Sequence, residues 1–152
     1  MTSHSPAEAA LRLSQLVDDK FRLLGVLIEK GKQQQQQITA GDATALLQLL
    51  AEKQTLIEEL QRLQDEIAAL QSRGDLAWAS PEARARCQSV AGQCNALGQL
   101  VLELEATCER HATTQRDAMA KQIHDFSNFN SRSSDSYSLD DETRLAEFDE
   151  SS

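Results

Sequence analysis

The sequence is poor in the residues from which β-sheets are built. Aromatic residues make up 4% of its 152 residues, and it contains only six glycines and two prolines. Strands favour β-branched and aromatic side chains, whereas this chain is rich in Ala, Leu, Gln and Glu, as long helices are. We therefore expect an all-α protein with a single domain, since a chain of this length leaves no room for two well-packed ones.

Two further absences limit the classes of partner. The formal net charge of −9 opposes binding to DNA, RNA or an anionic lipid surface. No apolar run approaches the roughly 18–20 residues of a membrane span, and the N-terminal MTSHSPAEAALRL lacks the basic and apolar regions of a secretory signal. We therefore expect a cytoplasmic protein that neither binds nucleic acid nor inserts into a membrane.

The sequence also lacks motifs for catalysis or cofactor binding: it has no glycine-rich phosphate loop, nucleophile elbow or paired metal motif. Along one helix Cys87 and Cys94 would be about 10 Å apart, and Cys94 and Cys108 about 20 Å, too far for a disulfide or a shared metal ion. The three occupy apolar positions, so we expect buried, reduced thiols. An intermolecular or metal-binding role is the alternative, for which only Cys108 and His111 are close enough to act together. We expect no enzyme and no cofactor.

The first helix is expected over residues 6–40. Ser5 can cap the free amides, Pro6 suits the first helical position, and Glu8 completes a capping box. A broad apolar face with helical spacing follows. It consists of Leu13, Leu16, Val17, Phe21, Leu23, Leu24, Leu27 and Ile28.

Five consecutive glutamines at 33–37 raise the question of whether this helix is interrupted. The apolar face would continue through Gly31, Gln35 and Ile38, and glutamine is a good helix former. We therefore expect the run to be helical, with Gly41 ending the helix and Asp42 capping the next one. Disorder of the run is the alternative, because a glycine and a polar face both weaken packing.

The second helix, expected over 42–73, has a heptad seam with unbroken 3-4 spacing. Its members are Leu46, Leu49, Lys53, Leu56, Leu60, Leu63, Ile67 and Leu70. Lys53 is the one charged member, and we expect its stem to pack while its ammonium reaches water. The alternatives are that Lys53 sets the helix register or meets a carboxylate of a partner.

The third helix, expected over 81–128, repeats the spacing from Cys87 to His111 and then becomes polar at Gln115 and Gln122. At about 1.5 Å per residue it would measure roughly 70 Å, against about 50 Å for each of the others. In an antiparallel three-helix bundle, residues from about 113 to 129 should therefore extend past their neighbours. This segment carries its own apolar stripe, which we interpret as a partner-binding surface. The stripe comprises Met119, Ile123, Phe126 and Phe129.

Residues at the two ends are expected to lie outside the 6–129 bundle. Residues 1–5 are interpreted as disordered, and the serine-rich, acidic segment 130–152 as a flexible tail with a short helix near 140–149. Apolar residues in this tail could fold back and cover the stripe, or the tail could serve only to aid solubility. If the stripe neither binds a partner nor is covered by the tail, this end of the helix would fray. The residues concerned are Leu139, Leu145 and Phe148.

The segment ITAGDATALLQLLAEKQTLIEEL resembles the FlgN-like flagellar export chaperones. In that family a first helix ends near a Gly-Asp turn, and a leucine-rich helix follows with a lysine about three turns in. The resemblance covers roughly residues 10–70, and the glutamine run and acidic tail depart from the family pattern. The matching positions are Gly41, Asp42, Leu46, Leu49, Leu50, Lys53, Leu56, Ile57 and Leu60.

This resemblance implies a cytoplasmic chaperone of the flagellar type III export system. Such proteins bind the C-terminal helical segments of hook-associated proteins, prevent their premature assembly and deliver them to components of the export gate. The family uses its C-terminal region for the client, in agreement with the stripe. The alternative is a structural coiled-coil adaptor that self-associates through the same stripe, as a homodimer, or that scaffolds partner proteins.

Overall fold

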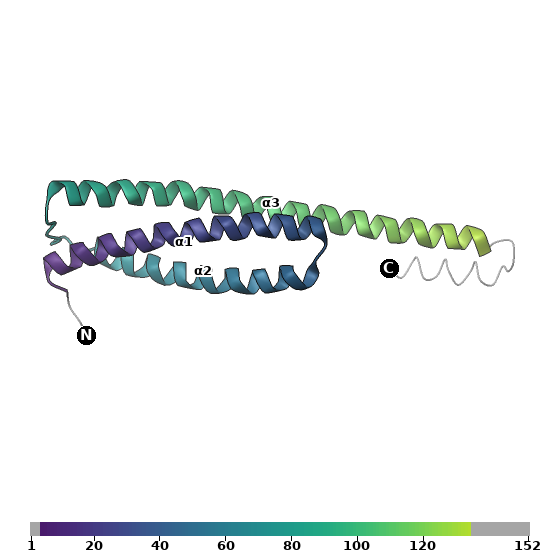
Figure 1. Cartoon of the computed structure of the whole chain (residues 1–152), viewed down its shortest axis with the longest axis horizontal. Coiled ribbons are helices and arrows are strands. Elements are labelled where there is room, and N and C mark those ends of the chain that lie inside the picture. The colour runs from purple at the N-terminus through teal and green to yellow at the C-terminus, as the bar shows by residue number, and fades with distance from the viewer. Residues whose placement is uncertain (1–3, 135–152) are drawn as a thin grey trace. The chain divides into compact units, whose positions relative to one another are not determined.

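The computed structural model describes residues 4–134, and the side chains of residues 4–129. These residues form three helices, α1 (Pro6–Ala40), α2 (Ala43–Gln71) and α3 (Pro81–Ser134), and no β-strand occurs among them (Figure 1). The expected all-α fold is confirmed. The chain divides into two compact units, Met1–Glu109 and Arg110–Ser152, and α3 contributes to both.

The helix boundaries differ from those expected chiefly at the C-terminal end. We expected the last helix to end at residue 128, whereas α3 continues to Ser134. The acidic tail beyond this point, with the short helix expected near 140–149, lies outside the described residues. So do Leu139, Leu145 and Phe148.

The starts of α1 and α3 follow the capping rules that the sequence suggested. The Glu8 amide donates to Ser5 Oγ at 3.2 Å, and Glu8 Oε2 accepts from the Ser5 amide at 3.5 Å, which completes a capping box. Before α3, Ser80 Oγ accepts from the Ala83 amide at 3.1 Å. Both helices thus satisfy part of their free N-terminal amides within the chain.

The glutamine run is helical, as expected, and α1 passes through it without a break. The helix ends at Gly41, whose φ of +73° is the left-handed conformation that glycine adopts most readily. The Gly41 amide donates to the carbonyls of Gln37 and Ile38 at 3.0 and 3.2 Å. Asp42 then caps α2 by accepting from the Ala45 amide at 3.1 Å. The two-residue connection therefore reverses the chain by ordinary capping interactions.

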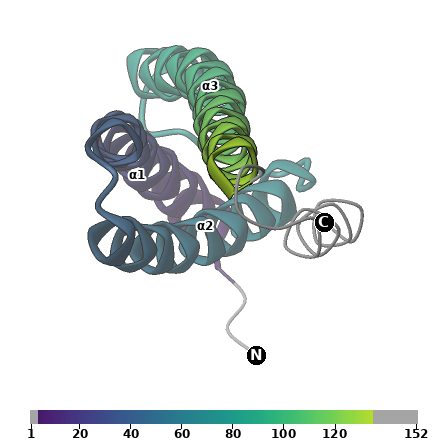
Figure 2. The same ribbon diagram turned by 90° about the vertical axis from the view of Figure 1, so that its right-hand side faces the viewer.

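In the first unit, consecutive helices run antiparallel, as expected. Near the start of α1, Arg12 pairs with Glu66 at 3.0 Å, and near its end Lys30 pairs with Glu52 at 2.8 Å. The part of α3 in this unit runs alongside α1 in the same direction, since Cys94 and Cys108 contact the backbone of Val17 and Gly31, respectively. Figure 2 shows α1, α2 and the first part of α3 at the corners of a triangle.

All three helices contribute to the core of the first unit. Leu16 is fully buried, and Trp78, in the connection before α3, packs partly buried against the core. Phe21 belongs to the expected apolar face of α1 but is not part of the core, since 38% of it is exposed. The buried members of the core cluster are Ala9, Leu13, Leu16, Val17, Leu23, Leu24, Leu63, Ile67, Leu70, Cys87 and Cys94.

Candidate functional site

The second unit contains an exposed apolar stripe on α3. Met119, Ile123 and Phe126 are 62%, 62% and 64% exposed, and we call these three residues the α3 stripe. Their spacing of four and three residues places them within about 60° of one another around the helix. Phe129, the fourth expected member, is 66% exposed. Three large apolar side chains on one helix face form a continuous surface suited to another apolar surface.

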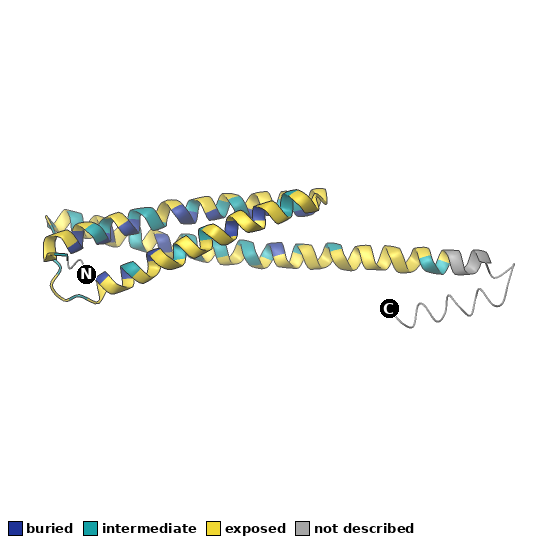
Figure 3. Cartoon of the chain, turned by 90° about the horizontal axis from the view of Figure 1, so that it is seen from below, coloured by how far each residue is buried: buried dark blue, intermediate teal, exposed yellow. Residues whose placement is uncertain are grey.

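The burial of α3 changes sharply along its length. In the first unit Cys87, Cys94 and Cys108 are buried, whereas no residue from 109 to 129 is (Figure 3). The heptad positions that continue from Cys108 include Gln115 and Gln122, which cannot extend an apolar seam. The apolar residues of the second unit lie on a different face, as the sequence indicated.

The charges around the α3 stripe are arranged unequally. Arg116 lies three residues before Met119 and seven before Ile123, on the stripe's own face, and it is exposed. The two acidic residues of this segment, Asp117 and Asp125, lie about 140° around the helix from the stripe. The charge nearest the stripe is therefore positive, in a protein whose net charge is −9.

Lys53 forms a second distinctive feature, a buried polar cluster in the first unit. Its side chain is 4% exposed, and Nζ donates to Gln34 Oε1 at 2.5 Å and to Glu105 Oε1. Burial lowers the pKa of Lys53, and a nearby Cys108 thiolate would partly offset this. The expectation that the ammonium reaches water is wrong, because the buried Lys53 side chain donates to Gln34 of α1 and to Glu105 of α3, although the Glu105 side chain is itself 43% exposed. The carboxylate that it meets belongs to this same chain.

Gln34 and Glu105 were not singled out from the sequence. Gln34 lies three residues after Gly31 and four before Ile38, so helical spacing could have placed it on the buried face in preference to Gln35. Gly31 itself allows a close approach, since a Cβ there would lie 3.3 Å from Leu104 Cδ1. Glu105 likewise lies four residues after Val101 and three before Cys108, beside the inner face of α3, but its pairing with Lys53 depends on how α3 packs.

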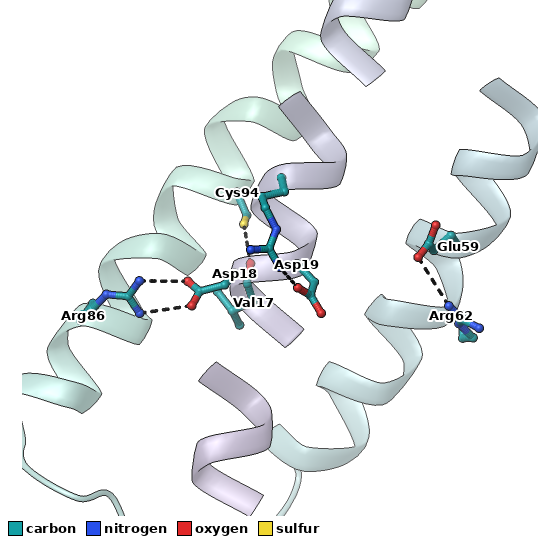
Figure 4. A network of polar contacts seen from close by, with 8 residues as sticks. Val17, Asp18, Asp19, Glu59, Arg62, Arg86 and Cys94 are labelled. Atoms are coloured by element: carbon teal, nitrogen blue, oxygen red, sulfur yellow. Dashed lines mark hydrogen bonds and ion pairs between the residues drawn. The ribbon is translucent and has the colours of Figure 1, made fainter. Parts of the chain in front are cut away.

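The three cysteines are free and buried, as expected. Cys94 Sγ donates to the Val17 carbonyl at 3.7 Å, and Cys108 Sγ donates to the Gly31 carbonyl at 3.6 Å. Burial raises the pKa of all three thiols, because the charged thiolate is disfavoured away from water. Figure 4 shows Cys94 beside the Asp18–Arg86 ion pair, which joins α1 to α3 at 3.3 Å. These thiols pack the helices together and are poor nucleophiles.

The positions that carry the family resemblance lie at the α1–α2 turn and along the inner face of α2. Gly41 and Asp42 form the turn, and Leu49 and Lys53 are buried. Leu46, Leu56 and Leu60 are partly buried. The seam positions Leu46, Leu49, Lys53, Leu56 and Leu60 therefore support the bundle, whereas the two other matching positions, Leu50 and Ile57, are 39% and 43% exposed.

A second exposed apolar surface lies on the outer side of α2. Leu47, Leu50 and Ile57 are 69%, 39% and 43% exposed, and we call them the α2 face. Together with Gln54 they follow a 3-4-3 spacing, one residue after each of four seam positions. This spacing is visible in the sequence, but we did not predict an exposed surface from it.

Other kinds of site find less support in the described part of the chain. Among residues 4–134, no group of three His, Cys, Asp or Glu side chains is arranged to hold a metal ion. Within the same range, no helix combines the length and apolar character needed to cross a bilayer. Comparisons with protein-family models, curated proteins and solved structures return no match for this chain.

Proposed function

We propose that this protein is a chaperone that binds an amphipathic helix of a client protein through the α3 stripe. The observation that carries the proposal is the exposure of Met119, Ile123 and Phe126, each above 60%, on one face of a regular helix. A client helix with apolar residues at matching three- and four-residue spacing would cover that face. Covering the client's own apolar surface would keep it from associating prematurely.

The expected strength of binding suits a reversible chaperone. Complete burial of each large apolar side chain contributes about 1.5–3 kcal/mol. Three such anchors, together with their counterparts on the client, can support an affinity in the micromolar range, about −8 kcal/mol, after the entropic cost of association. A client held with this affinity is released readily when it is handed on.

For the client, we propose the C-terminal helical segments of flagellar hook-associated proteins, with delivery to the export gate in the cytoplasm. This narrower proposal rests on the resemblance of the Gly41–Asp42 turn and the Lys53-containing seam to FlgN-like chaperones. A separation of roles supports it: the turn and the buried seam of α2, which carry most of the resemblance, build the bundle, whereas the α3 stripe is exposed.

Calorimetric titration of the full-length protein with C-terminal peptides of hook-associated proteins from the same genome would test the proposal. We expect micromolar binding that falls at least tenfold in the M119A/I123A/F126A variant. The L47A/L50A/I57A variant is the matched control, because it removes three exposed apolar side chains from α2 instead. Equal binding by both variants would move the site away from α3, and no binding by the wild type would refute the flagellar client.

A structural adaptor that self-associates is the second candidate function, and the α2 face favours it. Leu47, Leu50 and Ile57 form a seam beside the buried one, a pattern typical of helices that contact two partners. Light scattering over a range of protein concentrations distinguishes the two functions. A stable dimer that L47A/L50A/I57A converts to a monomer, combined with no peptide binding, would make the adaptor the better assignment.

A further inference from the structure

We propose that the chain's own C-terminal segment, residues 135–152, occupies the α3 stripe until a client helix displaces it. This inference concerns the occupant of the stripe, and only its regulatory consequence rests on the proposed function. Three features of the stripe and its surroundings support it: charge, distance along the chain and the supply of apolar side chains.

The charges of the two segments are complementary. Residues 110–134 contain four basic and two acidic residues, a net charge of +2, and Arg116 lies on the face of the stripe. Residues 135–152 contain seven acidic residues and one arginine, a net charge of −6. The net charge of residues 1–109 is −5, so the segment that carries the stripe is the cationic part of an otherwise acidic chain. Electrostatic attraction therefore favours pairing of the acidic segment with this part of α3.

The distance along the chain is short enough for the pairing. Met119, the most distant member of the stripe, precedes Ser134 by fifteen residues, or about 22 Å of helix. Eighteen residues can span up to about 60 Å when extended. The segment can thus turn back and cover the whole stripe with residues to spare, and it brings three large apolar side chains, Leu139, Leu145 and Phe148.

A second copy of the chain is a less suitable occupant. Two copies of residues 110–134 would each bring a net charge of +2 to the interface, whereas the acidic segment brings the opposite sign. A tethered segment also has the advantage of an effective concentration in the millimolar range. If the free segment binds with a Kd of about 1 mM or slightly below, tethering it lowers the apparent affinity for a client about twofold to tenfold.

Methionine methyl NMR tests the occupancy without any client. The chain has only two methionines, Met1 and Met119, so a sample labelled with ¹³C at the methionine methyl groups reports on the stripe directly. We expect the Met119 signal of the full-length wild type to differ from that of the full-length L139A/L145A/F148A variant, which keeps every charge. Adding the free peptide of residues 135–152 to the variant should move the signal back toward its wild-type position. D140N/D141N/E142Q should give an intermediate position, because attraction is weakened while the apolar residues remain.

Identical Met119 signals in the wild type and L139A/L145A/F148A would overturn the proposal. A difference that disappears on tenfold dilution would also overturn it and would indicate a second copy as the occupant. Titration with the hook-associated peptide then separates this inference from the proposed function. If L139A/L145A/F148A binds the peptide two- to tenfold more tightly than the wild type does, the result supports both the occupancy of the stripe by residues 135–152 and the proposed client. If the Met119 signal shifts but neither protein binds the peptide, the occupancy is supported and the client is refuted.

Discussion

The two parts of α3 differ in where they place their apolar side chains. Up to Glu109 the buried residues are small: Cys94 and Cys108 are 2% and 1% exposed. After Arg110 the apolar residues are large, and Ile123 and Phe126 are 62% and 64% exposed. The small thiols let the helix approach α1 closely enough to contact its carbonyls, while the large side chains of the second part are exposed.

Burial of charge differs between the same two regions. The first unit encloses the ammonium of Lys53 and gives it two acceptors, although enclosing a charge is costly. The second unit has no buried residue among its described side chains. The first unit thus has the features of a rigid scaffold with a specified packing, and the second those of an interaction surface.

The largest effect that we expect is the difference in unfolding free energy between a substitution in the core of the first unit and one in the α3 stripe. Leu16→Ala should lower the free energy of unfolding by about 2–5 kcal/mol, because the side chain is fully buried in the first unit. Met119→Ala should change it by no more than about 0.5 kcal/mol, since the side chain is 62% exposed. Urea denaturation followed by circular dichroism measures both. A comparable loss for Met119→Ala would contradict the assignment of the stripe to an interaction surface.

The Lys53 cluster provides the next largest effect. Glu105→Ala leaves the buried ammonium with Gln34 as its acceptor and should cost about 1–3 kcal/mol. The double variant K53M/E105A should recover most of that loss, because an apolar side chain of similar length needs no acceptor. A double-mutant cycle should therefore give a coupling energy of about 1–2 kcal/mol. A coupling near zero would mean that the pair does not contribute to stability.

Much of this architecture is predictable from the sequence because it depends on local rules. The capping box at Ser5, the turn at Gly41 and the seam of α2 each follow from spacing within one segment. The partners of Lys53 were missed because they come from two other helices, and no pattern within α2 specifies them. The α3 stripe could be recognised as apolar, but no pattern within α3 specifies a partner for it.

Replacing glycine by alanine at the α1–α2 turn and in the interior of α1 should change the free energy of unfolding by about 1 kcal/mol in opposite directions. Gly41→Ala should destabilise the protein by about 1–2 kcal/mol, because φ of +73° is unfavourable for a residue with a Cβ. Gly25→Ala is the matched control inside α1, where an added Cβ meets nothing within 4 Å and should stabilise the helix by up to about 1 kcal/mol. Thermal unfolding should shift in opposite directions for the two variants. A shift of the same sign would argue against the helix end at Gly41.

The smallest expected effect is the pH dependence of stability at alkaline pH. The pKa of each buried cysteine is raised from its usual value of 9.0, so above that pH the folded state retains protons that the unfolded state loses, and stability falls.

Lys53 acts in the opposite direction. Its pKa is lowered from 10.5, so as the pH rises through its folded-state pKa toward 10.5 the unfolded state binds more protons, and this residue adds stability. The wild type should therefore lose less stability than K53M over this range, by under about 1 kcal/mol, as measured by urea denaturation at a series of pH values. A constant difference between the two proteins would contradict the lowered pKa, and would indicate that Gln34 and Glu105 stabilise the Lys53 ammonium in the folded bundle as well as water does in the unfolded chain.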